Sequence, residues 1–488
     1  MGKLITDYWL YQKRFIIGYT LMALTIIGLL FVAGVFIPGG LSKPEMDSVV
    51  ASDAASISFE SFKPESVIDL PYHLLQHASI SLFGVSNLSI KLPSLVLGAL
   101  SSFGVFLLLR MWFRRNVAVL TAVIVITTGQ FLFVAQSGTP SIVYVFWSVW
   151  LLVCAMMISR RAKHSILWKV ALFCIAALSM YTPLSPYILI ALASAIILHP
   201  HLRYLIRRLS KVKIAFGFFI ALILIAPLVY AIIRQPSVGL TLLGIPSEQP
   251  DIKENVLQLL RQYLDFVSPS SGIVMTPIYG LGTVILIALG IIQLVTTKYT
   301  ARSYVITAWI LLLAPVLLIN PGYISITFVP VMLLVAMGIS KLLTNWYQLF
   351  PKNPYARFAG LLPLTILIAG LVLSGVGRYM YGYTYDPRTA GNFTHDLQMI
   401  NRQLADNKVT TTILSSPDEA PFYSVVADHN KEVTTVSNTP LSNVTGSETI
   451  IVTHDAHKTS DKGPLYRIVT DSVSSGGDRL YIYKTAVK

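Results

Sequence analysis

The sequence has 488 residues, of which 54% are hydrophobic and only 12% are charged, about half of the roughly 25% charged residues typical of soluble domains. Together with a mean hydropathy of +0.66, this composition excludes an ordinary soluble enzyme and a disordered protein, and it indicates a polytopic membrane protein. The net charge of +14 is compatible with nucleic-acid binding or with basic cytoplasmic loops, so the positions of the charges must decide.

Apolar segments of spanning length, or close to it, recur along the first 380 residues. The first is too long for the apolar core of a typical signal peptide, so we expect it to be retained as a span. The predicted fold class is therefore mainly α, a polytopic membrane helix bundle with about 11 transmembrane helices. The segments are 15–37, 92–109, 117–135, 142–158, 166–182, 184–198, 214–233, 278–297, 303–319, 323–343 and 358–377.

Charge is distributed unevenly between the two sets of loops. If the N-terminus is cytoplasmic, the inner loops hold 20 basic residues and one acid, Asp7, whereas the outer loops up to Arg378 hold 7 basic and 10 acidic residues. The excess of Lys and Arg on the inside predicts a multi-pass protein of the plasma membrane with its N-terminus in the cytoplasm and its C-terminus outside. Because the basic residues are spread thinly over every inner turn, the sequence does not favour a nucleic-acid partner.

Two outer loops are long enough to carry function, at 38–91 and 234–277. Amphipathic helices are predicted within them at 46–62, 73–83 and 251–267, where they pack on the spans or shape a substrate site. We expect residues 1–380 to form one transmembrane domain that includes both loops.

The tail, residues 381–488, has 10 basic and 12 acidic residues and no spanning run. A helix is predicted at 392–407, followed by strands near 410–415, 432–436, 448–453, 466–470 and 480–483. This pattern predicts a small extracytoplasmic α/β domain.

The interiors of the eleven predicted spans contain no Asp, Glu or Arg. Ion-coupled transporters usually place ionisable groups in the middle of the membrane. The pattern therefore disfavours a transporter or a lipid-linked-sugar flippase, and it directs the search for chemistry to the outer surface.

Two acids, Glu45 and Asp47, follow the first predicted span closely. Either carboxylate could deprotonate an acceptor hydroxyl while nearby cations hold a phosphate leaving group. The alternative is that they are solvated acids at the start of a helix, where a negative charge is favoured. Basic side chains expected on the same face include Lys43, Lys63, His73, His77, Lys91, Arg234, Arg261 and Arg378. His73 and His77 could also share a metal ion, but the sequence offers no clear third ligand.

Two motifs follow these acids. Residues 68–76 read IDLPYHLLQ, and residues 82–94 read LFGVSNLSIKLPS. This stretch resembles the integral-membrane glycosyltransferases of the GT-C fold, in particular protein O-mannosyltransferases and lipid A aminoarabinose transferases. In that family, a first-loop Asp-Glu pair precedes a Pro-rich aromatic motif and a stretch of the form LFG-x-S-x-x-x-x-R-L-P-S. The resemblance extends over about residues 10–345 in hydropathy and order, and over 40–140 in sequence.

The resemblance implies transfer of a sugar from a polyprenyl-phosphate donor to a protein or glycolipid acceptor at the outer face of the membrane. It assigns the general base to Asp47 or Glu45, and Lys43, His73, Lys91 and Arg261 are the predicted contacts of the donor phosphate. No cofactor motif is present, and the need for a divalent cation stays open.

The sequence departs from the family pattern at several positions. Met46 separates the two acids, so they cannot share one helical face and only one of them is expected to act. Lys91 stands where the family usually has Arg. Three positions that are charged in the family are neutral here, namely Gln136, Ser141 and Gly322. These departures leave a second hypothesis open, that of a non-catalytic membrane protein that binds or scaffolds cell-envelope glycolipids.

Overall fold

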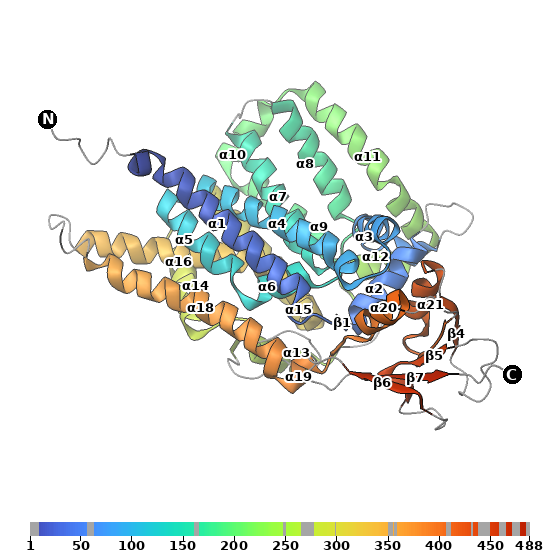
Figure 1. Ribbon diagram of the computed structural model, residues 1–488. Helices are drawn as coiled ribbons and strands as arrows, with labels where there is room; N and C mark the ends of the chain where they lie inside the picture. Colours follow the sequence, from blue (N-terminus) through green and yellow to red (C-terminus); the bar gives the residue numbers. More distant parts are fainter. Residues whose placement is uncertain are drawn as a thin grey trace.

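The computed structural model describes residues 9–55, 63–160, 165–246, 250–264, 278–297, 299–349, 355, 359–406, 411–430, 433–437, 449–457, 465–470 and 479–484. Long apolar helices form the bulk of the molecule and run roughly along one direction (Figure 1). A smaller α/β unit built from the C-terminal residues lies at one end of these helices. The predicted fold class, a membrane helix bundle with a small α/β tail, is confirmed.

Each of the eleven predicted spans is found as an apolar helix or a bent helix pair. Among the described residues, seven helices are long and apolar enough to cross a membrane, and the number is nine if each of the two bent pairs, α5–α6 and α9–α10, is one span. The shorter apolar helices α8 and α14 complete the set. These elements are α1 (Trp9–Val35), α4 (Asn87–Trp112), α5 (Arg115–Ile126), α6 (Gly129–Gln136), α7 (Ser141–Ser159), α8 (Ser165–Ser179), α9 (Ser185–Leu198), α10 (Pro200–Arg207), α11 (Lys211–Arg234), α14 (Leu281–Thr296), α15 (Ala301–Ile319), α16 (Phe328–Leu349) and α18 (Leu361–Tyr385).

Glycines allow two of these helices to approach closely. A Cβ atom at Gly290 of α14 would collide with the backbone carbonyl oxygen of Leu334, and one at Gly338 of α16 would collide with that of Leu286. Small residues at a helix crossing let the backbones come together where lipid supplies no hydrophobic drive. The α14–α16 pair is therefore held by main-chain packing.

The two predicted outer loops are largely helical. The first contains α2 (Lys43–Ala54), the 3₁₀ turn η2 (Pro64–Val67) and α3 (Leu70–Phe83), and the second contains α12 (Pro236–Leu242) and α13 (Ile252–Leu264). Pro44 and Pro71, at the first turns of α2 and α3, pre-set the helical backbone. A further 3₁₀ helix, η3 (Pro321–Thr327), precedes α16. The predicted helices thus exist, although the parts at 56–62 and 265–267 fall outside the described residues.

The C-terminal unit contains a five-stranded sheet of order β4-β3-β5-β7-β6. The pairs β3–β4 and β3–β5 are parallel, and β7 runs antiparallel to β5 and β6. Its elements are α19 (Pro387–Ala390), β2 (Phe393–Thr394), α20 (Asp396–Asp406), β3 (Thr411–Leu414), α21 (Ala420–Asp428), β4 (Val433–Ser437), β5 (Thr449–Val452), α22 (His454–His457), β6 (Arg467–Thr470) and β7 (Arg479–Lys484). The helix and all five strands predicted for the tail are present, whereas α21 was not predicted. The predicted domain boundary at 380 falls within α18.

The C-terminal unit packs on the first loop. Strand β1 (Leu41–Ser42) pairs antiparallel with β2, so that Leu41 lies opposite Thr394. Met46 and Val49 of α2 share one buried apolar cluster with Phe422 and Tyr423 of α21. This contact places the C-terminal unit beside the two acids of the first loop, at the end of the bundle where α2 packs on α21 (Figure 1).

Candidate functional site

Glu45 lies in the first turn of α2 and is fully buried. The backbone N–H and the hydroxyl of Ser42, the residue before the helix, donate to Oε2 at 2.8 and 2.9 Å. The backbone N–H of Gly138 donates to Oε1 at 2.6 Å. A carboxylate that receives three such bonds fixes the start of its helix and holds the segment between α6 and α7 against it.

Lys91 of α4 completes this cluster. Its Nζ lies 3.7 Å from Oε1 of Glu45, and neither side chain is exposed. The ammonium also donates to the carbonyl oxygen of Gly40 at 2.9 Å and to Oε1 of Gln136 at 3.1 Å. The structure therefore brings together two predicted site residues, Glu45 and Lys91, in a buried ion pair. Gln136, one of the three positions that are neutral here but charged in the family pattern, accepts a hydrogen bond from the Lys91 of this ion pair.

Asp47 lies on the opposite, exposed side of α2. Its neighbours Met46 and Val49 are buried in the cluster shared with the C-terminal unit. The two-residue spacing thus separates the acids as the sequence predicted, with Glu45 enclosed and Asp47 open to solvent. Of the two predicted base candidates, Asp47 is the exposed one.

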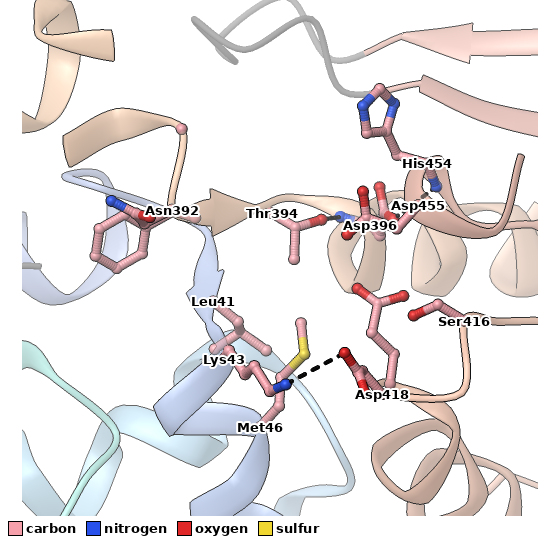
Figure 2. Close-up of a pocket in the computed structure, with 13 residues that line it drawn as sticks. Leu41, Lys43, Met46, Asn392, Thr394, Asp396, Ser416, Asp418, His454 and Asp455 are labelled. Carbon is pink, nitrogen blue, oxygen red and sulfur yellow. Dashed lines mark hydrogen bonds and ion pairs between the residues drawn. The ribbon is translucent and has the colours of Figure 1, made fainter. Parts of the chain in front are cut away.

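Lys43, at the start of α2, opens onto a cavity of about 320 Å³ between α2 and the C-terminal unit. Its Nζ lies 3.5 Å from Oδ2 of Asp418, with both side chains largely exposed, so the ion pair contributes little to stability. The other side of the cavity is acidic, and the backbone N–H of His454 donates to Oδ2 of the buried Asp396 at 3.2 Å (Figure 2). The lining is Leu41, Lys43, Met46, Gly391, Asn392, Phe393, Thr394, Asp396, Ser416, Asp418, Glu419, His454 and Asp455.

The negative charge of the lining limits what this cavity can bind. Among the described residues that line it, four are carboxylates, and Lys43 is the only lysine or arginine. The carboxylates repel a lipid phosphate, so their side of the cavity fits a neutral or cationic acceptor, whereas the Lys43 side attracts an anion. Within the described part of the chain, no three His, Cys, Asp or Glu side chains are grouped so as to hold a metal ion.

His73 lies on the buried face of α3, away from this cavity. Its Nδ1 is 2.9 Å from the hydroxyl of Ser52, which also donates to Oε1 of Gln76 at 2.6 Å. Gln76 in turn donates to the carbonyl oxygen of Gly138 at 2.9 Å. Burial lowers the pKa of His73 to about 4. The imidazole is therefore neutral at pH 7 and belongs to the packing between α2 and α3.

Asp69, which the sequence offered only as part of a motif, is a buried carboxyl group in the structure. It caps the start of α3 with a left-handed backbone (φ 53°, ψ 23°), and its N–H donates to the carbonyl oxygen of Tyr181 at 2.9 Å. Its Oδ1 has no hydrogen-bond partner among the described residues. Burial raises the pKa of Asp69 to about 7. An acid before Leu-Pro in a sequence suggests a helix cap. The burial of Asp69 could not be predicted locally, because the segment that contacts it, at Tyr181, is more than 100 residues away in the chain.

These two buried groups predict opposite pH effects on stability. Between pH 6.5 and 4 the unfolded chain protonates His73 while the folded chain resists, so stability falls as the pH falls, by a total of about 3 kcal/mol. Between pH 3.8 and 7 folded Asp69 keeps a proton that the unfolded chain releases, so stability falls as the pH rises. Thermal unfolding should be measured at pH 4.5, 6 and 7.5. The His73→Asn variant should lose less stability than the wild-type protein as the pH falls, and the Asp69→Asn variant should lose less stability as the pH rises toward neutral. Unchanged pH profiles in both variants would contradict these assignments.

The remaining predicted residues lie elsewhere. Arg261 is exposed on α13, a helix whose Asn255 donates to the carbonyl oxygens of Leu318 and Ile319. No contact among the described residues links Arg261 to the Glu45 cluster. Ser141 begins α7, with its hydroxyl 3.0 Å from that of Thr139. The structure thus leaves Arg261 apart from the predicted phosphate contacts of the first loop.

Comparison with known proteins decides the fold. Residues 71–230 match the family model described as dolichyl-phosphate-mannose-protein mannosyltransferase. The apo structure of ArnT from Cupriavidus metallidurans superposes with a TM-score of 0.53 at 12% identity, covering 95% of this chain and 98% of that one. The chain has the GT-C fold. The predicted resemblance to membrane glycosyltransferases of this fold is confirmed.

Two more solved structures are similar to this GT-C chain at lower scores. ArnT from Cupriavidus metallidurans bound to undecaprenyl phosphate gives a TM-score of 0.49 at 14% identity, covering 96% of this chain and 98% of that one. The oligosaccharyltransferase AglB from Archaeoglobus fulgidus, in complex with an inhibitory peptide and a dolichol-phosphate, gives 0.49 at 12% identity, covering 91% and 70%. No curated protein matches the sequence.

Proposed function

We propose that this GT-C protein is a glycosyltransferase that moves a hexosyl or pentosyl group from a polyprenyl-phosphate donor to a protein or glycolipid acceptor. The observation that carries the proposal is the match of residues 71–230 to a family named for a dolichyl-phosphate sugar donor. The match includes Lys91 and the segment 136–141, the parts of the chain that surround Glu45. The excess of basic residues in the loops on the N-terminal side supports an outer-face reaction with the C-terminal unit outside the membrane.

The proposed reaction is a displacement at the anomeric carbon of the donor sugar. Asp47 takes the proton of the acceptor nucleophile, whose oxygen or nitrogen forms a bond to that carbon. The bond between the anomeric carbon and the phosphate oxygen breaks, and polyprenyl phosphate leaves with both electrons of that bond. Asp47 is chosen because it is the exposed acid of the pair. Glu45 acts as a positioning residue, because its bonds to Ser42 and Gly138 hold the start of the helix that carries Asp47.

The exposed cations are better placed for the donor phosphate than the enclosed ones. Lys43 and Arg261 are exposed, whereas Lys91 is fully enclosed by its bonds to Glu45 and Gln136 and His73 is neutral at pH 7. Lys43 is also one helical turn from Asp47. We therefore assign the phosphate contact near the reacting carbon to Lys43, with the Glu45–Lys91 pair as its support.

Replacing Asp47 by Asn is expected to reduce sugar transfer by about 10²- to 10⁴-fold, the usual contribution of a general base. The assay uses the purified protein in nanodiscs with a panel of radiolabelled polyprenyl-phosphate sugars and envelope acceptors. Asp53→Asn, on the same helix, is the matched control and should keep wild-type transfer. Full activity in the Asp47→Asn variant would move the base to another residue, and Asp69→Asn would be tested next.

A second candidate function is a non-catalytic protein that binds or scaffolds envelope glycolipids. The full enclosure of Glu45 and the neutral Gln136 of α6 beside it favour this reading, because a carboxylate with no exposed surface is closed to a substrate and Gln136 supplies no charge to bind one. It requires that the wild-type protein binds a labelled polyprenyl-phosphate sugar without turnover at any pH or with any added divalent cation. Multiple turnovers by the wild-type protein exclude it.

A further inference from the structure

A second, separate cavity of about 570 Å³ lies at the other end of the bundle, where α4 and α7 end and α15 begins. Its wall is almost entirely apolar, and four basic side chains interrupt it, namely Lys169, His201, Arg208 and Arg302. Among the described residues that line it, none is Asp or Glu. An apolar cavity with several cations and no acid is complementary to an amphiphile that has a negative head.

The geometry of α10 places the mouth of this cavity at the depth of lipid headgroups. Helix α9 is long and apolar, and α10 turns away from it by 95°. Such a bend aligns α10 with the membrane plane when α9 crosses it. Leu202, Leu205 and Ile206 of α10 line the cavity, and three of its other positions are basic, namely His201, Arg203 and Arg207. An apolar face with flanking cations is typical of a helix that lies at the membrane interface.

Lys169 supplies the observation that points to a ligand. The residue lies on α8, is 5% exposed and lines the cavity. Within the described part of the chain, neither a hydrogen bond nor an ion pair reaches its ammonium. An ammonium without a protein partner beside a largely apolar wall leaves its charge open to an anion bound in the cavity.

Arg302 of α15 strengthens the same conclusion from the facing side of the cavity. One guanidinium nitrogen donates to the carbonyl oxygen of Trp112 at 3.0 Å, and the group lies 4.7 Å from the ring centroid of Phe113. Its Nε is buried and has no partner among the described residues. The guanidinium is thus held in position while its buried Nε–H has no partner among the described residues.

We propose that this cavity binds an anionic glycerophospholipid from the bilayer leaflet on the N-terminal side, with its phosphate at Lys169 and Arg302 and an acyl chain along the apolar wall. Arg208, which is exposed and stacks on Tyr204 at 4.5 Å, lies at the mouth and adds attraction for the headgroup. The site is distinct from the outer-face site, because it lies at the opposite ends of α4 and α7. It gives the protein a dependence on lipid composition that does not require the transfer reaction.

The test is a titration of the purified full-length protein in detergent with phosphatidylglycerol or phosphatidylcholine of identical chains, followed by native mass spectrometry. Phosphatidylglycerol should bind at least about tenfold more tightly than phosphatidylcholine. Lys169→Met keeps the apolar stem and removes the charge, and it should lose this preference. Arg203→Met, an exposed residue of α10 that does not line the cavity, is the matched control and should keep it.

Thermal unfolding gives a second readout, in which the variant is expected to be at least as stable as the wild-type protein without lipid and less stabilised than it by added lipid. Without added lipid, Lys169→Met should melt at the same temperature as the wild-type protein or higher, because it removes a charge that has no partner among the described residues and keeps the apolar stem. Phosphatidylglycerol should then raise the melting temperature of the wild-type protein but not that of the variant. If Lys169→Met does not fold, Arg208→Met at the exposed mouth should still weaken phosphatidylglycerol binding measurably. Equal binding of the two lipids, tighter binding of undecaprenyl phosphate than of phosphatidylglycerol, or an unchanged preference in the Lys169→Met and Arg208→Met variants would each overturn the proposal.

Discussion

Lys91→Met is expected to destabilise the protein by about 3–5 kcal/mol, the cost of removing one partner from a buried ion pair. The substitution leaves the Glu45 carboxylate without a cation in a fully enclosed site, and it also removes the donors to Gly40 and Gln136. The first loop, the start of α4 and the segment after α6 would lose their common anchor. Reversible unfolding in SDS, followed by tryptophan fluorescence, measures the change in the free energy of unfolding.

A double substitution separates the charge from the packing. Lys91→Met combined with Glu45→Gln removes both charges. It should recover part of the lost stability, because the single amide oxygen can still accept the bonds from the N–H and the hydroxyl of Ser42, although the bond that Gly138 donates to the other carboxylate oxygen is lost. Lys43→Met is the matched surface control, since its ion pair with Asp418 is exposed and should change stability by less than about 1 kcal/mol. If Lys91→Met and Lys43→Met cost the same, the Glu45–Lys91 pair does not anchor the loop.

Gly290→Leu is the second substitution with a large expected effect. The added Cβ would fall on the backbone carbonyl oxygen of Leu334, which cannot rotate away as a side chain can, so α14 and α16 must separate. Over-packing usually costs about 1–3 kcal/mol, and a clash with main chain should lie at or above the top of that range. We expect a sharp fall in the yield of folded protein on size-exclusion chromatography, together with a lower melting temperature.

The control for Gly290→Leu is Gly370→Leu on α18. A Cβ atom at Gly370 meets no heavy atom within 4 Å, so the same substitution should be tolerated there. Gly338→Leu, on the partner helix, should resemble Gly290→Leu because it collides with the carbonyl oxygen of Leu286. Equal tolerance at positions 290 and 370 would show that α14 and α16 are not in backbone contact.

Hydropathy predicted most of the bundle because every span must satisfy its backbone internally and present apolar side chains. The bends in α5–α6 and α9–α10 were not predicted, since a continuous apolar run does not reveal a change of direction. The pattern of apolar and polar residues predicted the five strands of the tail. The helix α21 was missed because its apolar residues Phe422, Tyr423, Val425 and Val426 pack against both the sheet and α2, which a single chain segment cannot indicate.

The candidate site was only partly predictable for the same reason. Spacing alone separated Glu45 from Asp47, and the structure agrees that they face different ways. Spacing could not show which of the two acids faces solvent, because this depends on Lys91 and Gly138, which lie 46 and 93 residues after Glu45 in the chain. The roles predicted for Asp47, Glu45, Lys43, His73, Lys91 and Arg261 remain predictions for the assays described above.

The short ladder between β1 and β2 also sets an order of events during synthesis. Leu41 pairs with Thr394, so strand β1 of the first loop stays unpaired until a strand about 350 residues later in the chain has been synthesised. At about 5–20 residues per second, that wait lasts roughly 20–70 s. During this time Met46 and Val49 lack the α21 side chains that cover them in the finished protein. A ribosome that stalls or terminates before residue 393 therefore leaves a bundle whose first loop is uncovered, and this gives membrane quality control a defined feature to recognise.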